Sequence, residues 1–529
     1  MQDWPLRVMR LVDHAEQQHP TREIVSAWAD GSITRTDWRT VAAASRRLAQ
    51  KLVRIGIRPG ERVATLAMNH ARHLVAWYGT IGMGGVVHTL NPRLFDDQLD
   101  YIANHAEDRV LLYDRAFAPL VERLRTRLTT VEQFICMEDE LDAWIADEDG
   151  DFAWVEGDEN EPCGLCYTSG TTGNPKGVLY SHRSTTLHAM AEVAPDLFGL
   201  SVRSVVLPIV PMFHANAWGV PWAAPLAGCK LVLSADYRPA QLCDLYRDEG
   251  VTHSAGVPTV WLGMIEHVER TGADLGSLKH VTIGGSAAPR SMIAWFRDRG
   301  IQVGHAWGMT ETSPIGTCGS PSADWDSKTD TEQIDYIARQ GRGVFGVELR
   351  IVDDDGAELP RDGVAAGRLQ ARGPWVVKRY FKEPQDAVDA AGWFDTGDVA
   401  ILHPDGTMQI TDRSKDVIKS GGEWISSIEL ENVAVGCAGV AEAAAIGIAH
   451  PKWDERPLLL VVRADGSAVT EEAIRNHLGQ HVPRWWQPDA IEFVADLPHT
   501  ATGKLSKKTL REAYRDYRFA NAEAMVGRD

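Results

Sequence analysis

One short stretch, YTSGTTGNPKGV at residues 167–178, concentrates four small hydroxyl residues, three glycines and a lysine. Glycines allow the backbone to curl so that successive N–H groups point at one anion, and Ser and Thr hydroxyls add further donors. The lysine, Lys176, adds a point charge. A plain surface turn has no need of such dense hydroxyl groups. The stretch is therefore predicted to be a phosphate-binding loop.

This loop is not that of the common P-loop NTPases, whose G-x-x-x-x-G-K-[ST] motif places the lysine at the start of a helix. Here Lys176 follows Pro175 and precedes Gly177, so that pattern fails. The preceding residues 163–167, CGLCY, are short and mostly apolar, as a buried strand would be. Their two cysteines have the spacing of half a zinc site, but the sequence holds no second such pair. Alternation along a buried strand explains them better.

Two motifs further along the chain could grip a phosphorylated ligand and a cation. GHAWGMTETSP, residues 304–314, holds Thr310 and Glu311 in a glycine-bounded turn, where their oxygens suit phosphate and a hard cation. Helix capping is the alternative explanation of that turn. GWFDTGDVA, residues 392–400, places Asp398 at the entry of a strand, where a carboxylate could accept both hydroxyls of a ribose. A plain Asp turn would explain it as well.

Two more motifs lie near the C-terminus. DRSKDVIKSGGEWISSIELE, residues 412–431, combines a charged hexapeptide, a Gly-Gly turn and a helix start capped by Ser426 with Glu429 three residues on. PHTATGKLSKK, residues 498–508, puts Lys504 on a glycine-containing turn, where it could meet a phosphate if a small C-terminal domain closes. For any single lysine, a solvated surface position is the ordinary alternative.

The composition limits the classes of partner. The 529 residues are 44% hydrophobic and 24% charged, as in ordinary globular proteins, and exceed one typical domain. The net charge of −19, partly in the acidic residues 138–161, argues against nucleic acids and anionic membranes. Seven scattered cysteines form no framework and favour reduced thiols in a cytoplasm. The N-terminus lacks an apolar signal core, and residues 74–87 are too short and Gly-rich to span a bilayer.

Strand and helix patterns alternate through the first two thirds of the chain, which predicts parallel sheets covered on both faces. The expected strands lie in residues 61–69, 85–92, 204–214, 229–234 and 278–286. From residue 343 the pattern changes to short β runs joined by Asp-Gly turns at 355–356 and 405–406, as in hairpins. GRGVFG, residues 341–346, matches the G-x-G-x-x-G fingerprint but leads into these β runs and not into a helix, so a dinucleotide site is not expected.

In this order, YTSGTTGNPKG, TGD, DRSKD and TGK resemble the motifs of the adenylate-forming superfamily of acyl-CoA synthetases, adenylation domains of peptide synthetases and beetle luciferases. The resemblance runs from LNPRL at 90–94 to TGKLSKK at 502–508. YSHR, VPMFHANAW, GGSAAPRS and IKSGGEWISS look most like the branch of medium- and long-chain fatty acyl-CoA synthetases, which also includes ligases for methylmercaptopropionate and related short acids.

The resemblance implies an α/β fold. A large N-terminal domain, residues 1–411, would hold two parallel βαβ-type sheets plus a small distorted β-barrel. Residues 412–417 would form a hinge linker, and residues 418–529 a small mobile α+β domain. The resemblance also implies a homodimer without a transmembrane segment.

The implied reaction has two steps, in which a carboxylic acid attacks the α-phosphorus of MgATP to give acyl-AMP, and CoA then takes the acyl group. Both steps build negative charge on oxygens, so positioning and electrostatic stabilisation would dominate. Residues implied to bind the nucleotide and Mg²⁺ fall into groups. The β and γ phosphates would be held by Thr168, Ser169, Gly170, Thr171, Thr172, Gly173 and Lys176, the metal by Thr168 and Glu311, and the ribose by Asp398 and Arg413. Gly285, Ser286 and Ala287 would wall the adenine, and Gly308 and Thr310 would also belong to the nucleotide site. Trp307 would stack on adenine where the family usually has Tyr.

The remaining implied roles concern the acid, CoA and domain motion. His214 would sit beside the acyl group, Trp218 would gate its tunnel, and Gly284 and Gly285 would wall the carboxylate. Lys504 would bridge the carboxylate and α-phosphate during adenylation, and the small domain would then rotate about Lys415. The turn that this rotation presents to CoA comprises Lys419, Gly421, Gly422, Glu423 and Trp424.

Three other functions remain open from the sequence: an enzyme that loads a carrier protein, a luciferase-type oxygenase and a non-catalytic nucleotide-binding module. The first lacks an appended carrier domain here, and nothing specifically supports the second. Retention of Lys176, Glu311 and Lys504 argues against the third.

Overall fold

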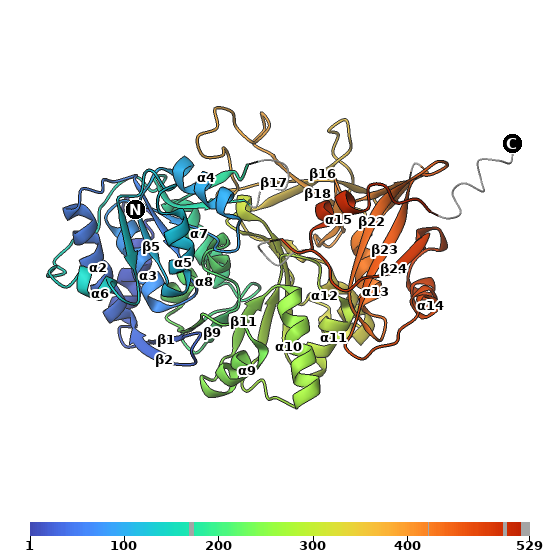
Figure 1. The fold of residues 1–529 in the computed structure, drawn as a ribbon, viewed down its shortest axis with the longest axis horizontal. Coiled ribbons are helices and arrows are strands. Elements are labelled where there is room, and N and C mark those ends of the chain that lie inside the picture. The colour runs from blue at the N-terminus through green and yellow to red at the C-terminus, as the bar shows by residue number, and fades with distance from the viewer. Residues whose placement is uncertain (169–173, 422, 501–504, 520–529) are drawn as a thin grey trace.

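The computed structural model describes residues 1–168, 174–421, 423–500 and 505–519. These residues form four sheets that follow one another along the molecule, from the N-terminal part to the C-terminal part (Figure 1). The predicted α/β class is confirmed, with mixed sheets instead of purely parallel ones.

The first sheet has six strands in the order β6-β5-β3-β4-β7-β8 and ends in the antiparallel pair β7–β8. Its other pairs are parallel, as the alternation of strand and helix patterns predicts. The strands are β3 (Arg62–Leu66), β4 (Val86–Thr89), β5 (Asp108–Tyr113), β6 (Gln133–Cys136), β7 (Pro162–Tyr167) and β8 (Gly177–Ser181). The helices of this region are α2 (Trp38–Arg54), α3 (Ala71–Gly82), α4 (Asp96–Ala106), α5 (Ala118–Leu124), α6 (Leu141–Trp144) and α7 (His182–Glu192).

The second sheet has nine strands in the order β15-β14-β13-β12-β11-β9-β10-β1-β2. The central strands β1 and β9–β13 pair in parallel, and the two ends of the sheet are antiparallel. The strands are β1 (Glu23–Ala27), β2 (Ile33–Asp37), β9 (Val205–Pro208), β10 (Lys230–Ser234), β11 (His253–Gly256), β12 (His280–Ile283), β13 (Gln302–Gly308), β14 (Ile315–Cys318) and β15 (Arg342–Gly343). The accompanying helices are α1 (Met9–Gln18), α8 (Val220–Ala227), α9 (Pro239–Asp248), α10 (Pro258–Thr271), α11 (Arg290–Asp298) and α12 (Asp330–Ala338).

The third sheet is an open antiparallel meander of β16 (Glu348–Val352), β17 (Ala366–Arg372), β18 (Phe394–Leu402) and β19 (Met408–Arg413), so the expected small β-barrel is not formed. The reason lies at the outer edge of β19, where Met408 donates to the Gly341 carbonyl (2.7 Å) and accepts from the Gln340 N–H (2.9 Å). This edge is therefore filled by the segment before β15 and cannot pair with β16. The Asp-Gly turn at 405–406 joins β18 to β19, as predicted.

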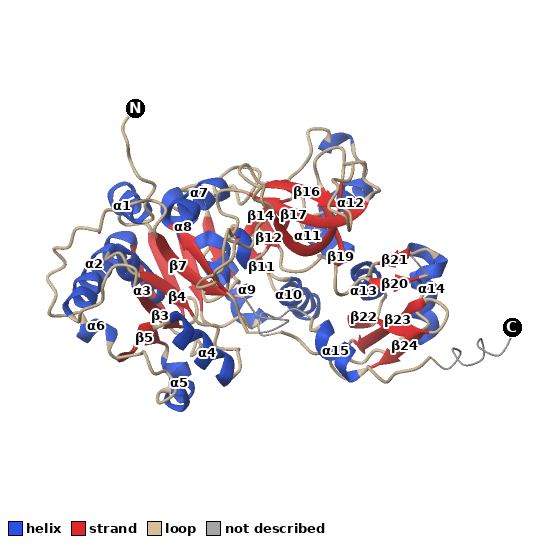
Figure 2. Ribbon diagram, turned by 90° about the horizontal axis from the view of Figure 1, so that it is seen from above, coloured by secondary structure: helices blue, strands red, loops and turns tan. Residues whose placement is uncertain are grey.

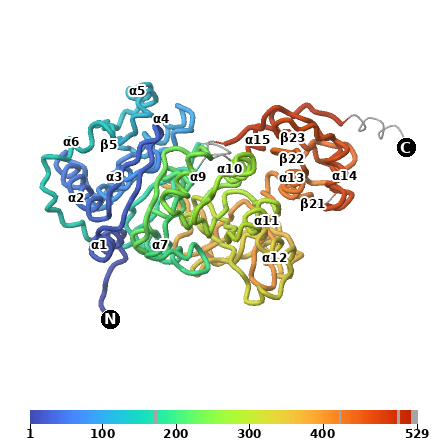
Figure 3. The backbone as a smooth tube through the Cα atoms, turned by 90° about the horizontal axis from the view of Figure 1, so that it is seen from below, coloured from blue at the N-terminus to red at the C-terminus, as the bar shows by residue number. Residues whose placement is uncertain are grey.

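The C-terminal sheet lies at the far end of the molecule in Figures 2 and 3. It contains β20 (Ile418–Ser420), β21 (Glu423–Ile425), β22 (Val440–His450), β23 (Asp454–Arg463) and β24 (Ala490–Phe493), with α13 (Ser427–Val435), α14 (Glu471–His481) and α15 (Lys507–Ala513). Ser426 caps α13 by accepting from the Glu429 N–H (3.1 Å), as predicted. The C-terminal part has its own apolar core, formed by residues of this sheet, α13 and α14.

The membrane-like stretch at residues 74–87 belongs to α3 and β4, and every residue of α3 from His73 onward is buried. Among the described residues, none of the helices combines the length and the apolar character needed to cross a bilayer.

Candidate active site

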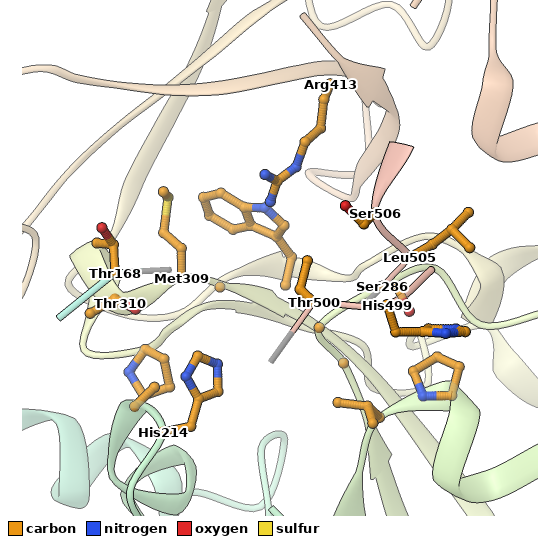
Figure 4. Close-up of a pocket in the computed structure, with 18 of the residues that line it drawn as sticks. Thr168, His214, Ser286, Met309, Thr310, Arg413, His499, Thr500, Leu505 and Ser506 are labelled. Atoms are coloured by element: carbon orange, nitrogen blue, oxygen red, sulfur yellow. The ribbon is translucent and has the colours of Figure 1, made fainter. Parts of the chain in front are cut away.

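A cavity of about 1250 Å³ opens where the first three sheets and the C-terminal part approach one another. In Figure 4, Thr168, Thr310 and His214 face this hollow from one side, while Arg413, His499 and Ser506 approach it from the other. The cavity collects most of the residues that the sequence singled out. Its lining includes Thr168, Lys176, His214, Trp218, Gly284, Gly285, Ser286, Ala287, Trp307, Gly308, Thr310, Glu311, Asp398, Arg413 and Lys415.

The phosphate-binding loop connects β7 to β8, so it closes a hairpin and does not open a helix. Its two ends are held together because the Thr168 N–H donates to the Lys176 carbonyl (2.9 Å), and the Lys176 N–H donates to the Thr168 hydroxyl (3.2 Å). Ser169, Gly170, Thr171, Thr172 and Gly173 lie outside the described residues. Cys163 and Cys166 are buried in β7, and burial raises the pKa of the Cys163 thiol to about 12, in keeping with the predicted strand.

The turn that carries Glu311 is the 3₁₀ segment η3 (Thr310–Thr312), beside the phosphate-binding loop in the cavity. The Tyr180 hydroxyl of β8 donates to the Thr310 carbonyl (2.9 Å), which ties the turn to the loop hairpin. Glu311 is only 7% exposed, and its carboxylate accepts a hydrogen bond from the Tyr380 hydroxyl (2.8 Å). Hydroxyl and carboxylate oxygens thus face one region together with the ammonium of Lys176, an arrangement suited to a polyphosphate with a hard cation.

Asp398 and Arg413 are direct cross-strand partners in the β18–β19 ladder. One carboxylate oxygen of Asp398 lies 3.4 Å from Arg413 Nε, and the other accepts the indole N–H of Trp307 (2.8 Å). Trp307 packs against Gly316, where a Cβ would lie 2.3 Å from the ring, so the indole has a fixed position. Trp307 therefore orients the carboxylate of Asp398, and stacking on adenine stays a prediction for it.

His214 and Trp218, the residues predicted to contact the acyl group, both line the cavity, and Trp218 lies on a backbone segment with an unusual conformation. In the 3₁₀ segment η2 (Ala215–Gly219), the non-glycine residues have positive φ, with Trp218 at 57°. Left-handed backbone is unfavourable by about 1–2 kcal/mol for each such residue. The indole is held against Gly284, where a Cβ would lie 3.2 Å from Trp218 Cη2. Strained backbone of this kind concentrates at functional sites, which favours a role for Trp218 beyond packing.

The predicted hinge residue Lys415 lines the cavity, and the segment around it is attached to the C-terminal part. Asp412 is fully buried and accepts from both the N–H and the hydroxyl of Ser427 (2.7 Å each). Lys507 of α15 reaches the Ser427 hydroxyl (2.5 Å) and the Glu431 carboxylate (2.8 Å). Burial alone would lower the pKa of Lys507, but the carboxylates of Glu431 and Asp412 outweigh it and raise that pKa.

Several predicted residues are not brought into the cavity. Lys419, Gly421 and Trp424 are absent from its described lining, and Trp424 is 37% exposed on the C-terminal part. Glu423 begins β21 on the same turn. Gly422 and Lys504 lie outside the described residues.

The lining residues that sequence reasoning missed include Tyr380, Arg93 and Lys507. The guanidinium of Arg93 lies 5.7 Å from the ring centroid of Phe213, and Arg93 belongs to the LNPRL motif at residues 90–94. Tyr380 lies in an irregular segment between β17 and β18, and no motif noted in the sequence includes it.

The family comparison covers most of the chain. A family described as AMP-binding enzyme matches residues 12–381, and the C-terminal domain of AMP-binding enzymes matches residues 429–504. The 3-methylmercaptopropionyl-CoA ligase of Ruegeria lacuscaerulensis is 49% identical, with 98% of each chain covered. The medium-chain-fatty-acid–CoA ligase of Ectopseudomonas oleovorans is 47% identical, over 96% of this chain and 95% of that protein.

Among solved structures, ATP-bound MatB from Rhodopseudomonas palustris is 25% identical and superposes with a TM-score of 0.83, over 97% of this chain and 99% of that one. Sequence relatives and fold thus agree along almost the full length. The chain belongs to the AMP-binding enzyme family of the adenylate-forming superfamily.

Proposed function

We propose that this protein is an AMP-forming carboxylate–CoA ligase. It activates a monocarboxylic acid with an apolar tail as acyl-AMP and then transfers the acyl group to CoA. The observation that carries this proposal is the single cavity whose polar side contains Thr168, Lys176 and Glu311 and whose other side is apolar. The two relatives named above, both CoA ligases, support the same reaction.

In the first step, a carboxylate oxygen of the acid attacks the α-phosphorus of ATP, and the bond to the β,γ-pyrophosphate breaks. Lys176 and the loop residues from Thr168 onward hold the departing phosphates, and Asp398 with Arg413 binds the ribose. Lys504 stabilises the charge between the carboxylate and the α-phosphate. These groups act by position and charge, which is the main source of catalysis in phosphoryl transfer.

The residues present fit a Mg²⁺ ion bound together with ATP. Mg²⁺ prefers one or two carboxylates plus substrate phosphates to an all-protein cage. Glu311 supplies one carboxylate and Thr168 one hydroxyl, and the described residues contain no cluster of three or more acidic, His or Cys side chains that could hold a metal by themselves. When bound, Mg²⁺ neutralises charge on the phosphate oxygens.

In the second step, the CoA sulfur attacks the acyl carbon, and the bond to the AMP oxygen breaks. The C-terminal domain, residues 418–529, rotates between the steps about Lys415, withdraws Lys504 and presents the turn from Lys419 to Trp424. Support comes from the contacts of Asp412 with Ser427, which attach the linker of residues 412–417 to the C-terminal side. These contacts support a domain boundary after residue 411, although Asp412 and Arg413 also end β19 of the third sheet.

The acid is proposed to be a fatty acid or a thioether acid such as methylmercaptopropionate. Ile209, Val257, Val260 and Leu262 line the same cavity as Trp218. Each buried methylene contributes about 0.8 kcal/mol, close to a fourfold gain in affinity. We also propose that the protein forms a homodimer. The compartment is proposed to be a reducing cytoplasm, because all seven cysteines are free and buried.

The test is a panel of acids assayed with ATP and CoA for thioester, AMP and pyrophosphate. The kcat/KM values show whether the enzyme prefers a fatty acid or a thioether acid. The panel contains propionate, hexanoate, octanoate, palmitate and 3-(methylthio)propanoate. A carrier-loading enzyme would exchange pyrophosphate with ATP but leave CoA unacylated. Absence of acid-dependent AMP formation with every acid would refute the ligase.

A further inference from the structure

Tyr380 lies at the polar side of the cavity, on the irregular segment between β17 and β18. Backbone hydrogen bonds attach this segment to both phosphate-side elements. The Val377 N–H donates to the Glu311 carbonyl (2.7 Å), and the Phe381 N–H donates to the Gly177 carbonyl (2.8 Å). Tyr380 is therefore held between the turn of Glu311 and the end of the phosphate-binding loop.

The hydroxyl and the ring of Tyr380 contact two different charged groups. The hydroxyl donates to Glu311 Oε1 (2.8 Å), and Lys176 Nζ lies 4.8 Å from the centroid of the ring. A hydrogen bond from a neighbouring group fixes the direction of a metal-binding carboxylate. A cation at this distance from an aromatic face is attracted by the ring quadrupole.

We propose that Tyr380 is a positioning residue for the adenylation step, which orients Glu311 through its hydroxyl and Lys176 through its ring. The inference rests on the proposed function, since it assigns Glu311 to the cation and Lys176 to the phosphates. The proposal makes one side chain responsible for the spacing between the carboxylate of Glu311 and the ammonium of Lys176. The two contacts use different atoms, so substitution separates them.

The experiment measures metal and nucleotide binding directly, with Mn²⁺ as the probe for the Mg²⁺ site. Mn²⁺ is titrated into the enzyme–ATP complex and followed by electron paramagnetic resonance, while ATP affinity without metal is measured by calorimetry in EDTA. Tyr380→Phe keeps the ring and removes the hydroxyl. We expect its Mn²⁺ affinity to fall roughly 10- to 100-fold, with the metal-free ATP affinity unchanged.

Tyr380→Leu removes both contacts and is expected to show the same loss of Mn²⁺ affinity plus a roughly two- to fivefold loss of metal-free ATP affinity. The matched control is Tyr246→Phe, which removes a buried hydroxyl bonded to Ser254 (3.0 Å) in the core outside the cavity lining. This control should leave both affinities at the wild-type value.

Wild-type Mn²⁺ affinity in Tyr380→Phe would overturn the proposal, and so would an equal loss of metal-free ATP affinity in both Tyr380 variants. Failure of the proposed function has a different signature. Wild type that binds ATP and Mn²⁺ but forms no acyl-CoA would contradict the ligase and leave the comparison of Tyr380 variants valid.

Discussion

Replacing Trp307 by Phe tests whether the indole orients the ribose-binding carboxylate or only contacts adenine. The substitution retains an aromatic ring against Gly316 and removes the N–H that reaches Asp398 at 2.8 Å. Asp398 is 6% exposed, so water cannot readily replace the lost donor. A hydrogen bond to a charged group contributes about 1.5–3 kcal/mol, which corresponds to roughly 10- to 150-fold in affinity.

We expect the lower end of that range, about tenfold weaker ATP binding, because Arg413 still lies 3.4 Å from the other oxygen of Asp398. Calorimetry should compare ATP with 2′,3′-dideoxy-ATP for wild type and Trp307→Phe. If Trp307 acts through Asp398, the loss disappears with the nucleotide that lacks the hydroxyls. The control is Trp28→Phe, which removes an indole N–H bonded to Thr34 (3.0 Å) outside the cavity lining.

Equal losses for ATP and the dideoxy nucleotide would refute this reasoning and assign Trp307 to adenine contact alone. Unchanged affinity for both nucleotides would show that neither the N–H nor the larger ring matters to binding.

Four further substitutions test the other assignments. Lys504→Ala should lower acid-dependent pyrophosphate exchange by roughly 100- to 1000-fold while acyl-AMP and CoA still give thioester; equal losses in both assays would contradict the role. Lys415→Pro fixes φ and should preserve pyrophosphate exchange but abolish thioester formation, and normal turnover would place the hinge elsewhere. Lys507→Met leaves the mostly buried Glu431 without its cation and should reduce the free energy of unfolding of the C-terminal part by about 3–5 kcal/mol in denaturant titrations. A change below about 1 kcal/mol would argue against this ion pair. Trp218→Ala should shift the preferred chain length in kcat/KM, whereas a uniform decrease with lower thermal stability would make Trp218 a packing residue.

The sequence predicted the elements that depend on local signals. The apolar run of residues 163–167 became β7, and the proline and glycine beside Lys176 placed β8 after the loop where a P-loop has a helix. Ser426 became the cap of α13, and the turn at 405–406 became a hairpin. Each outcome follows from backbone preferences within a few residues and does not depend on distant contacts.

The predicted small β-barrel is wrong, and the cause is a contact between distant parts of the chain. Short β runs with Asp-Gly turns specify an antiparallel sheet, but closure depends on which strand meets the outer edge of β19. Gln340 and Gly341, about 70 residues away in the chain, occupy that edge. No local sequence pattern predicts that this segment will pair with β19.

The sequence by itself determined the family and the chemistry that its loops can perform, because glycine-rich turns and the order of motifs are local and specific. Only the tertiary structure decided which side chains of the site form hydrogen bonds with one another. Trp307 donates to Asp398 across 91 positions of sequence, and Tyr380 to Glu311 across 69. Trp307 and Asp398 lie in strands of two different sheets, and Tyr380 and Glu311 lie in two separate connecting segments, so packing and not neighbouring residues sets these partners.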